Sequence, residues 1–170
     1  MPLQNKEKVY QRIVFLAGMI VALNGMINLI QTIVAYYSGE MLQYLIEDTV
    51  VEPSTLDGGF LTSMLVIIMA VAVISTLISL LIGISAMREA KGRQKNCIYL
   101  IISSIVLLLM AIAFLADVAW YIQYREPVTE WLDFFLSIAY LILMAALIHC
   151  AKLLRRIHAS RRIAETRKYV

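Results

Sequence analysis

Residues 60–86, FLTSMLVIIMAVAVISTLISLLIGISA, decide the fold of this chain because they belong to its longest stretch without a charged side chain. A helix of about 20 residues crosses the roughly 30 Å apolar core of a bilayer, and a helix of a water-soluble bundle would carry a polar stripe that this stretch lacks. Four such stretches occur, and they contain 27 residues between Arg12 and Glu40, 30 between Asp57 and Arg88, 21 between Lys95 and Asp117, and 18 between Asp133 and Lys152. The sequence therefore predicts four membrane-spanning helices.

The expected fold class is an all-α membrane protein built as a four-helix bundle. The predicted transmembrane helices cover residues 13–37, 60–86, 97–120 and 133–153, and they form a single membrane domain that extends over residues 1–170. Hydrophobic residues make up 61% of the chain and its mean hydropathy is +0.79, which leaves little polar surface for a second, soluble domain. Residues 154–170 are expected to continue the fourth helix as a basic tail, because no Pro or Gly interrupts them.

Lysine and arginine are unevenly distributed among the segments that flank the predicted helices. Fourteen of the fifteen lie before the first helix, between the second and third helices, or in the C-terminal tail, and Arg125 is the exception. Segments rich in these residues remain on the cytoplasmic side of a membrane. The sequence therefore predicts that both termini are cytoplasmic, and the Ile-rich and Met-rich helices are typical of a multi-pass protein of the bacterial cytoplasmic membrane.

Polar side chains within the predicted spans are the first candidates for a functional site, because each is costly in lipid unless it has a partner or faces water. Their spacing places three on one stripe of the first helix, and counting along the helices places three more in the same outer layer. One hypothesis is a polar pocket open to the outer face. The alternative is that the amides only bond neighbouring helices while Asp117 reaches interfacial water. The residues are Asn24, Asn28, Gln31, Asp117, Ser137 and Tyr140.

Small residues recur every four positions along the second predicted helix, at Ser75, Ser79 and Gly83. Small side chains allow two helix backbones to approach closely in a membrane, where packing replaces the hydrophobic effect as the cause of association. The pattern predicts a helix-packing seam. The partner across it is either another helix of this chain or a second subunit.

The predicted tail carries a dense group of basic residues close to the membrane boundary. Each Lys or Arg near an anionic leaflet contributes about 1 kcal/mol of attraction. The sequence therefore predicts contact with anionic lipid at the cytoplasmic face. Nucleic acid is not expected as a partner, because these charges lie within reach of lipid and no base-reading element or aromatic platform accompanies them. The predicted lipid contacts are Lys152, Arg155, Arg156, Arg161 and Arg162.

Metal, cofactor and disulfide chemistry are not expected. Cys97 and Cys150 lie near the cytoplasmic ends of their helices, which removes tetraspan classes whose outer loops require disulfides, such as claudins and tetraspanins. Neither cysteine forms a compact ligand pair with His149 or His158. The spans contain no Ser-His, Glu-x-x-His or paired-carboxylate arrangement, so we do not expect an enzyme.

Two functional classes remain open from the sequence. The first is a non-catalytic membrane protein, an accessory or scaffold subunit that packs beside other membrane proteins or copies of itself. The second is a small transporter or channel component that uses the polar layer in the outer half of the bundle. The two differ in whether that layer is a dry packing surface or a wet cavity.

Overall fold

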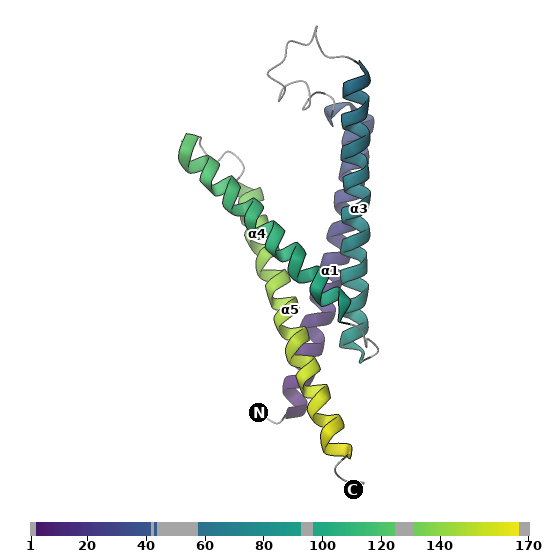
Figure 1. Ribbon diagram of the computed structural model, residues 1–170, viewed down its shortest axis with the longest axis vertical. Helices are drawn as coiled ribbons and strands as arrows, with labels where there is room; N and C mark the ends of the chain where they lie inside the picture. Colours follow the sequence, from purple (N-terminus) through teal and green to yellow (C-terminus); the bar gives the residue numbers. More distant parts are fainter. Residues whose placement is uncertain (1–2, 42, 44–57, 93–96, 125–130, 167–170) are drawn as a thin grey trace. The chain divides into compact units, whose positions relative to one another are not determined.

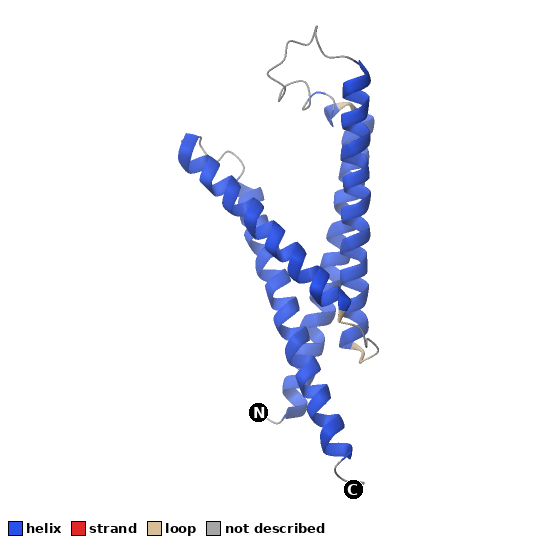
Figure 2. Ribbon diagram, viewed as in Figure 1, coloured by secondary structure: helices blue, strands red, loops and turns tan. Residues whose placement is uncertain are grey.

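The computed structural model describes residues 3–41, 43, 58–92, 97–124 and 131–166, without the side chains of residues 3, 4, 58, 124, 131–133 and 161–166. The described residues form four long α-helices, namely α1 (Leu3–Ser38), α3 (Gly58–Ala90), α4 (Ile98–Tyr124) and α5 (Trp131–Thr166) (Figures 1 and 2). All four helices are long and apolar enough to cross a membrane. The predicted all-α class with four membrane-length helices is therefore confirmed.

The predicted spans lie within these helices except for Cys97, which precedes α4 by one residue, and the helices continue beyond the spans. α1 begins at Leu3, about ten residues before the predicted first span, and α5 includes the predicted tail as far as Thr166. A helix need not end where the apolar residues end, because its hydrogen bonds join backbone groups four residues apart whatever the polarity of the side chains. The described basic residues Lys6, Lys8 and Arg12 therefore lie on α1, and Lys152, Arg155 and Arg156 lie on α5.

α3 ends in a turn closed by Gly92, whose φ of 70° is accessible to glycine at little cost. The amide of Gly92 donates to the carbonyl of Glu89 at 2.8 Å, and the amide of Lys91 donates to the carbonyl of Met87 at 3.3 Å. These bonds satisfy carbonyl groups of the last helical turn. They also hold Glu89 in that turn, at the end of a membrane-length helix.

The chain forms two compact units, and their boundaries fall inside α1 and α3. The first unit contains Met1–Ile20 and Ile82–Val170, and the second contains Val21–Leu81. The predicted single membrane domain would require these two units to pack together, and it stays a prediction.

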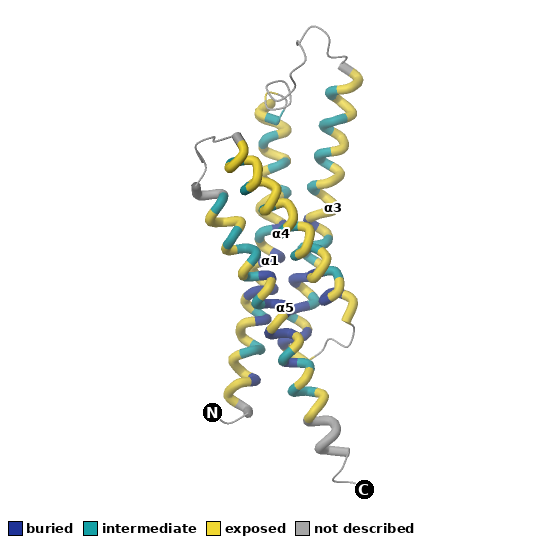
Figure 3. The backbone as a smooth tube through the Cα atoms, turned by 60° about the vertical axis from the view of Figure 1, so that its left-hand side comes forward, coloured by how far each residue is buried: buried dark blue, intermediate teal, exposed yellow. Residues whose placement is uncertain are grey.

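The first unit contains most of the buried residues that the structure describes (Figure 3). They come from the first half of α1, the end of α3, the start of α4 and the middle of α5. On each helix they recur every three or four residues, which places them on one face. The largest fully buried side chains of this core are Val14, Ile82, Tyr99, Met144, Leu147 and Leu154.

The second unit is an antiparallel pair formed by the rest of α1 and the first part of α3. The Thr76 hydroxyl donates to the Gly25 carbonyl of α1 at 3.1 Å and to the Ala72 carbonyl of its own helix at 2.8 Å. A Cβ at Gly25 would lie 2.6 Å from the Cβ of Ser79, which is closer than real Cβ atoms approach. Glycine at position 25 is therefore required for this close contact.

Candidate functional site

The most deeply buried charge in the described part of the chain is the Glu89 carboxylate, whose side chain is only 3% exposed. It occupies the last turn of α3, three residues after Ala86 and seven after Ile82, which are both buried. The helix therefore directs Glu89 to the same side as its apolar residues. A carboxylate in such a position is costly unless charged or hydrogen-bonding groups surround it.

Arg155 of α5 supplies the counter-charge. Its Nε lies 3.0 Å and its Nη2 2.5 Å from Oε2 of Glu89, so two N–H groups of one guanidinium donate to the same oxygen. The Arg155 side chain is 21% exposed, and it therefore connects the buried carboxylate to the surface. Charge-assisted hydrogen bonds of this kind are roughly twice as strong as neutral ones.

The start of α4 completes the cluster. The Tyr99 hydroxyl donates to Oε2 of Glu89 at 3.4 Å, and the Arg155 guanidinium lies 5.6 Å from the centre of the Tyr99 ring. Nη1 of Arg155 also donates to Sγ of Cys97. We call Glu89, Tyr99, Cys97 and Arg155 the inner polar cluster. It joins α3, α4 and α5, although Arg155 is separated from Tyr99 in the sequence by most of α4 and the first part of α5.

A second polar contact extends this arrangement to α1. Nε2 of His158 lies 3.2 Å from Oε1 of Glu7, and the Glu7 carboxyl is largely buried. His158 follows Arg155 by three residues on α5, so both side chains leave the same face of that helix. α5 therefore contacts α1 through His158 and α3 through Arg155, and it holds both acidic residues away from water.

The residues of the predicted polar pocket are divided between the two units. Asn24, Asn28 and Gln31 belong to the second unit, where Asn24 is half-buried and the other two are exposed. The first unit contains the other three, of which Asp117 and Ser137 are exposed and Tyr140 is half-buried. No contact between the two groups is established, so the pocket stays a prediction.

The residues of the predicted packing seam have different surroundings. Ser79 lies against Gly25 of α1, and a Cβ at Gly18 of α1 would meet the Gly83 carbonyl at 2.8 Å. Ser75 is exposed, and its hydroxyl bonds the Ala72 carbonyl within α3. Two glycines seven residues apart on α1 therefore face Ser79 and Gly83. The sequence analysis did not single out these glycines.

The predicted lipid contacts of the tail also differ from one another. Lys152 and Arg156 are exposed, whereas Arg155 has its guanidinium in the inner polar cluster. The side chains of Arg161 and Arg162 lie outside the described residues. The exposed thiol of Cys97 and the buried thiol of Cys150 are both free. Among the described residues, no group of three or more His, Cys, Asp and Glu side chains is placed to hold a metal ion.

The inner polar cluster was not predicted from the sequence, where attention went to the Lys and Arg of the flanking segments and not to Glu89 or Glu7. A signal was present, since Glu89 continues the buried positions 82 and 86, and Glu7 precedes the buried Val14 by seven residues. Both acids therefore lie on apolar helix faces. Comparisons with protein-family models, curated proteins and solved structures give no match. The interpretation of the site therefore rests on its geometry.

Proposed function

We propose that this chain is a non-catalytic, multi-pass protein of the bacterial cytoplasmic membrane that serves as an accessory or scaffold subunit of a membrane complex. Both termini and the inner polar cluster then lie on the cytoplasmic side, in agreement with the distribution of Lys and Arg. The partners are other membrane proteins or further copies of the chain.

The observation that carries this proposal is the polar stripe on α1. Asn28 and Gln31 lie in a membrane-length apolar helix, three residues apart on one face, and both are exposed. An amide that faces lipid leaves its hydrogen-bonding groups unsatisfied, so a helix with this stripe gains by packing against a polar partner. A subunit of a complex would obtain such a partner from its neighbour.

The inner polar cluster supports a structural role for the charged groups of the first unit. Glu89 and Arg155 bond each other, and Tyr99 donates to the same carboxylate. The charged and hydrogen-bonding groups of this cluster therefore bond to one another and connect α3, α4 and α5. A rigid inner end is a suitable platform for a scaffold that presents its remaining apolar surface to partners.

A transporter or channel component is the second candidate, and the position of Asp117 favours it. This carboxylate is exposed in the last part of α4, within a membrane-length helix. An ionisable group in a span commonly marks a pathway for ions or substrates. The two proposals differ in whether partner helices or water covers the polar side chains.

The test is site-specific photo-crosslinking in living cells. A photoreactive phenylalanine analogue replaces Gln31 in one strain and Ile33 in a second strain. Residues two positions apart on an α-helix point about 200° apart, so the two analogues face nearly opposite sides of α1. We expect a protein adduct, either with another polypeptide or with a second copy, from position 31 and much less from position 33. Lipid adducts alone from both positions, together with cation or solute flux by the purified protein in liposomes, would favour the transporter.

A further inference from the structure

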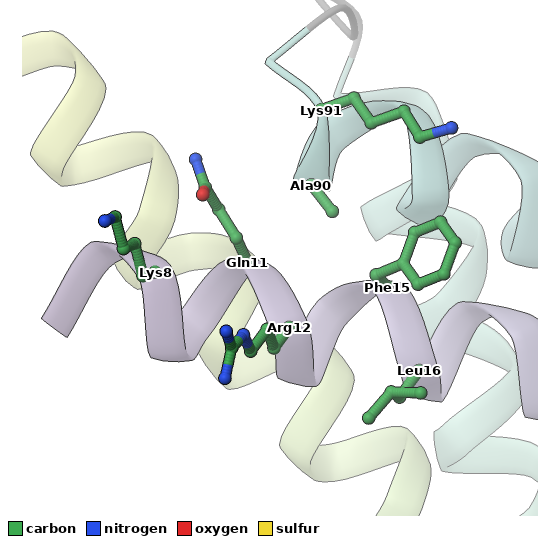
Figure 4. Close-up of a pocket in the computed structure, with 7 residues that line it drawn as sticks. All are labelled: Lys8, Gln11, Arg12, Phe15, Leu16, Ala90 and Lys91. Carbon is green, nitrogen blue, oxygen red and sulfur yellow. The ribbon is translucent and has the colours of Figure 1, made fainter. Parts of the chain in front are cut away.

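The first unit contains an open groove of about 500 Å³ between the start of α1 and the end of α3 (Figure 4). α1 contributes Lys8, Arg12, Phe15 and Leu16. Arg12 follows Lys8 by four residues, and Phe15 and Leu16 follow Arg12 by three and four, so all four lie on one side of the helix. The last turn of α3 and the residue that follows it contribute Ala90 and Lys91. The groove has the size of an ordinary small-molecule site, which occupies about 300–1,000 Å³.

The rim of this groove is cationic. Lys8, Arg12 and Lys91 are all exposed. Two of them have an acidic residue close in sequence, because Glu7 directly precedes Lys8 and Glu89 lies two residues before Lys91. The nearby acids have partners on α5, because Glu7 contacts His158 and Glu89 contacts Arg155. Both acids are thus held on the side that faces α5. The fold separates the charges of these segments and leaves three cations around one groove.

The wall of the groove is apolar. Phe15 is half-buried, and Leu16 is 51% exposed beside it. Figure 4 shows the Lys91 side chain extended over Phe15, with Nζ 5.5 Å from the centre of the ring. Such a lysine covers apolar surface with its methylene groups and keeps its charge at the rim. The groove therefore combines a cationic rim with an apolar wall.

We propose that this groove binds one anionic glycerophospholipid. In this site the phosphate lies beside Lys8 and Arg12, and the first part of an acyl chain lies along Phe15 and Leu16. Lys91 adds positive charge at the end of the groove next to Phe15. The groove is at the same end of two membrane-length helices, α1 and α3, where headgroups meet the apolar core. The inference rests on the membrane placement in the proposed function and is independent of any protein partner.

A free phosphate ion would use the cations but not the apolar wall. A neutral lipid such as phosphatidylcholine would use the wall, but its choline group would meet three positive charges. An anionic phospholipid matches both features. The proposed site also differs from the predicted lipid contacts of the tail, because it is a groove between two helices whose cations are gathered by tertiary packing.

The test uses the purified full-length protein in detergent, titrated with phosphatidylglycerol or phosphatidylcholine, with bound lipids counted by native mass spectrometry. The groove variant carries Lys8→Gln, Arg12→Gln and Lys91→Gln. The control variant carries Lys6→Gln, Arg88→Gln and Arg125→Gln, which belong neither to the groove lining nor to the predicted lipid contacts of the tail. The two variants lose the same charge. Circular dichroism and gel filtration establish that both remain folded.

We expect the wild-type protein to retain one phosphatidylglycerol more tightly than phosphatidylcholine. The groove variant should bind it at least about tenfold more weakly, since each cation near an anionic headgroup contributes about a fivefold change in affinity. The control variant should change it by less than about threefold on the same scale, because its cations lie outside the groove. Equal losses in both variants, or no loss in either, would overturn the proposal.

A second variant, Leu16→Gln, keeps every cation and makes the apolar wall polar. It should weaken phosphatidylglycerol binding as well, and millimolar inorganic phosphate should not displace the lipid from the wild-type protein. Displacement by phosphate, or full binding by Leu16→Gln, would identify a simple anion site and refute a lipid groove. These outcomes are measured without partners, so they are distinct from a failure of the crosslinking experiment.

Discussion

Removing the Arg155 guanidinium should destabilise the first unit more than removing any exposed charged group would. Arg155→Met keeps most of the side-chain volume but leaves the Glu89 carboxylate, 3% exposed, with the Tyr99 hydroxyl at 3.4 Å as its remaining donor in the cluster. Breaking a buried ion pair from one side costs 3–5 kcal/mol, and we expect about 3 kcal/mol because Arg155 reaches the surface. Glu89→Gln should cost less, about 2 kcal/mol, because the exposed edge of the guanidinium can bind water.

The assay is reversible unfolding of the purified protein in mixed micelles, driven by sodium dodecyl sulfate and followed by circular dichroism. The double variant Glu89→Gln/Arg155→Met should be about 2 kcal/mol more stable than the sum of the two single changes predicts, because the first substitution removes the charge that the second would leave unpaired. Arg88→Gln, an exposed neighbour on α3, is the control and should change stability by less than about 0.5 kcal/mol. Additive losses from the two single variants would refute the reasoning, because they would mean that the two side chains do not interact.

Three further predictions concern packing, topology and the outer polar layer. Gly25→Ala places a Cβ 2.6 Å from the Cβ of Ser79 and should cost about 1–3 kcal/mol in the same unfolding assay; an unchanged midpoint would show that α1 and α3 are not in close contact there. Tags at both termini should be cytoplasmic and a tag beside Pro53 external, as measured by protease accessibility in intact cells; an external terminus would contradict the interpretation of the basic segments. Asp117→Asn should leave both thermal stability in detergent and the growth phenotype unchanged, because a scaffold does not require this charge. A stable variant with impaired growth or solute uptake would instead favour the transporter.

The helices were predictable because their signal is local. An uncharged run such as residues 58–87 fixes the length of a membrane helix through the thickness of the bilayer, and no knowledge of its neighbours is needed. The ends were less predictable, since α1 and α5 continue into their charged segments. Backbone hydrogen bonding continues a helix until a proline or a turn residue such as Gly92 ends it, so the apolar limits underestimate helix length.

The charge count is a property of the sequence, but the partners of the charges are not. Arg155 was expected at the lipid surface with the other tail residues, yet its carboxylate partner, Glu89, lies 66 residues away on another helix. Glu7 and His158 are 151 residues apart. The rotation of each helix about its axis and the vertical register between helices decide such contacts, and a rotation by one residue, about 100°, would replace every one of them.

The sequence alone therefore determined an all-helical chain with four membrane-length segments and an excess of basic residues in three of the segments that flank them. Only the tertiary structure decided that Glu7 and Glu89 face α5 and that Lys8, Arg12 and Lys91 are left around an apolar groove. The physical reason is that hydrophobic length acts along one helix, whereas the pairing of charges depends on the distance between side chains of different helices. That distance is set when the helices pack.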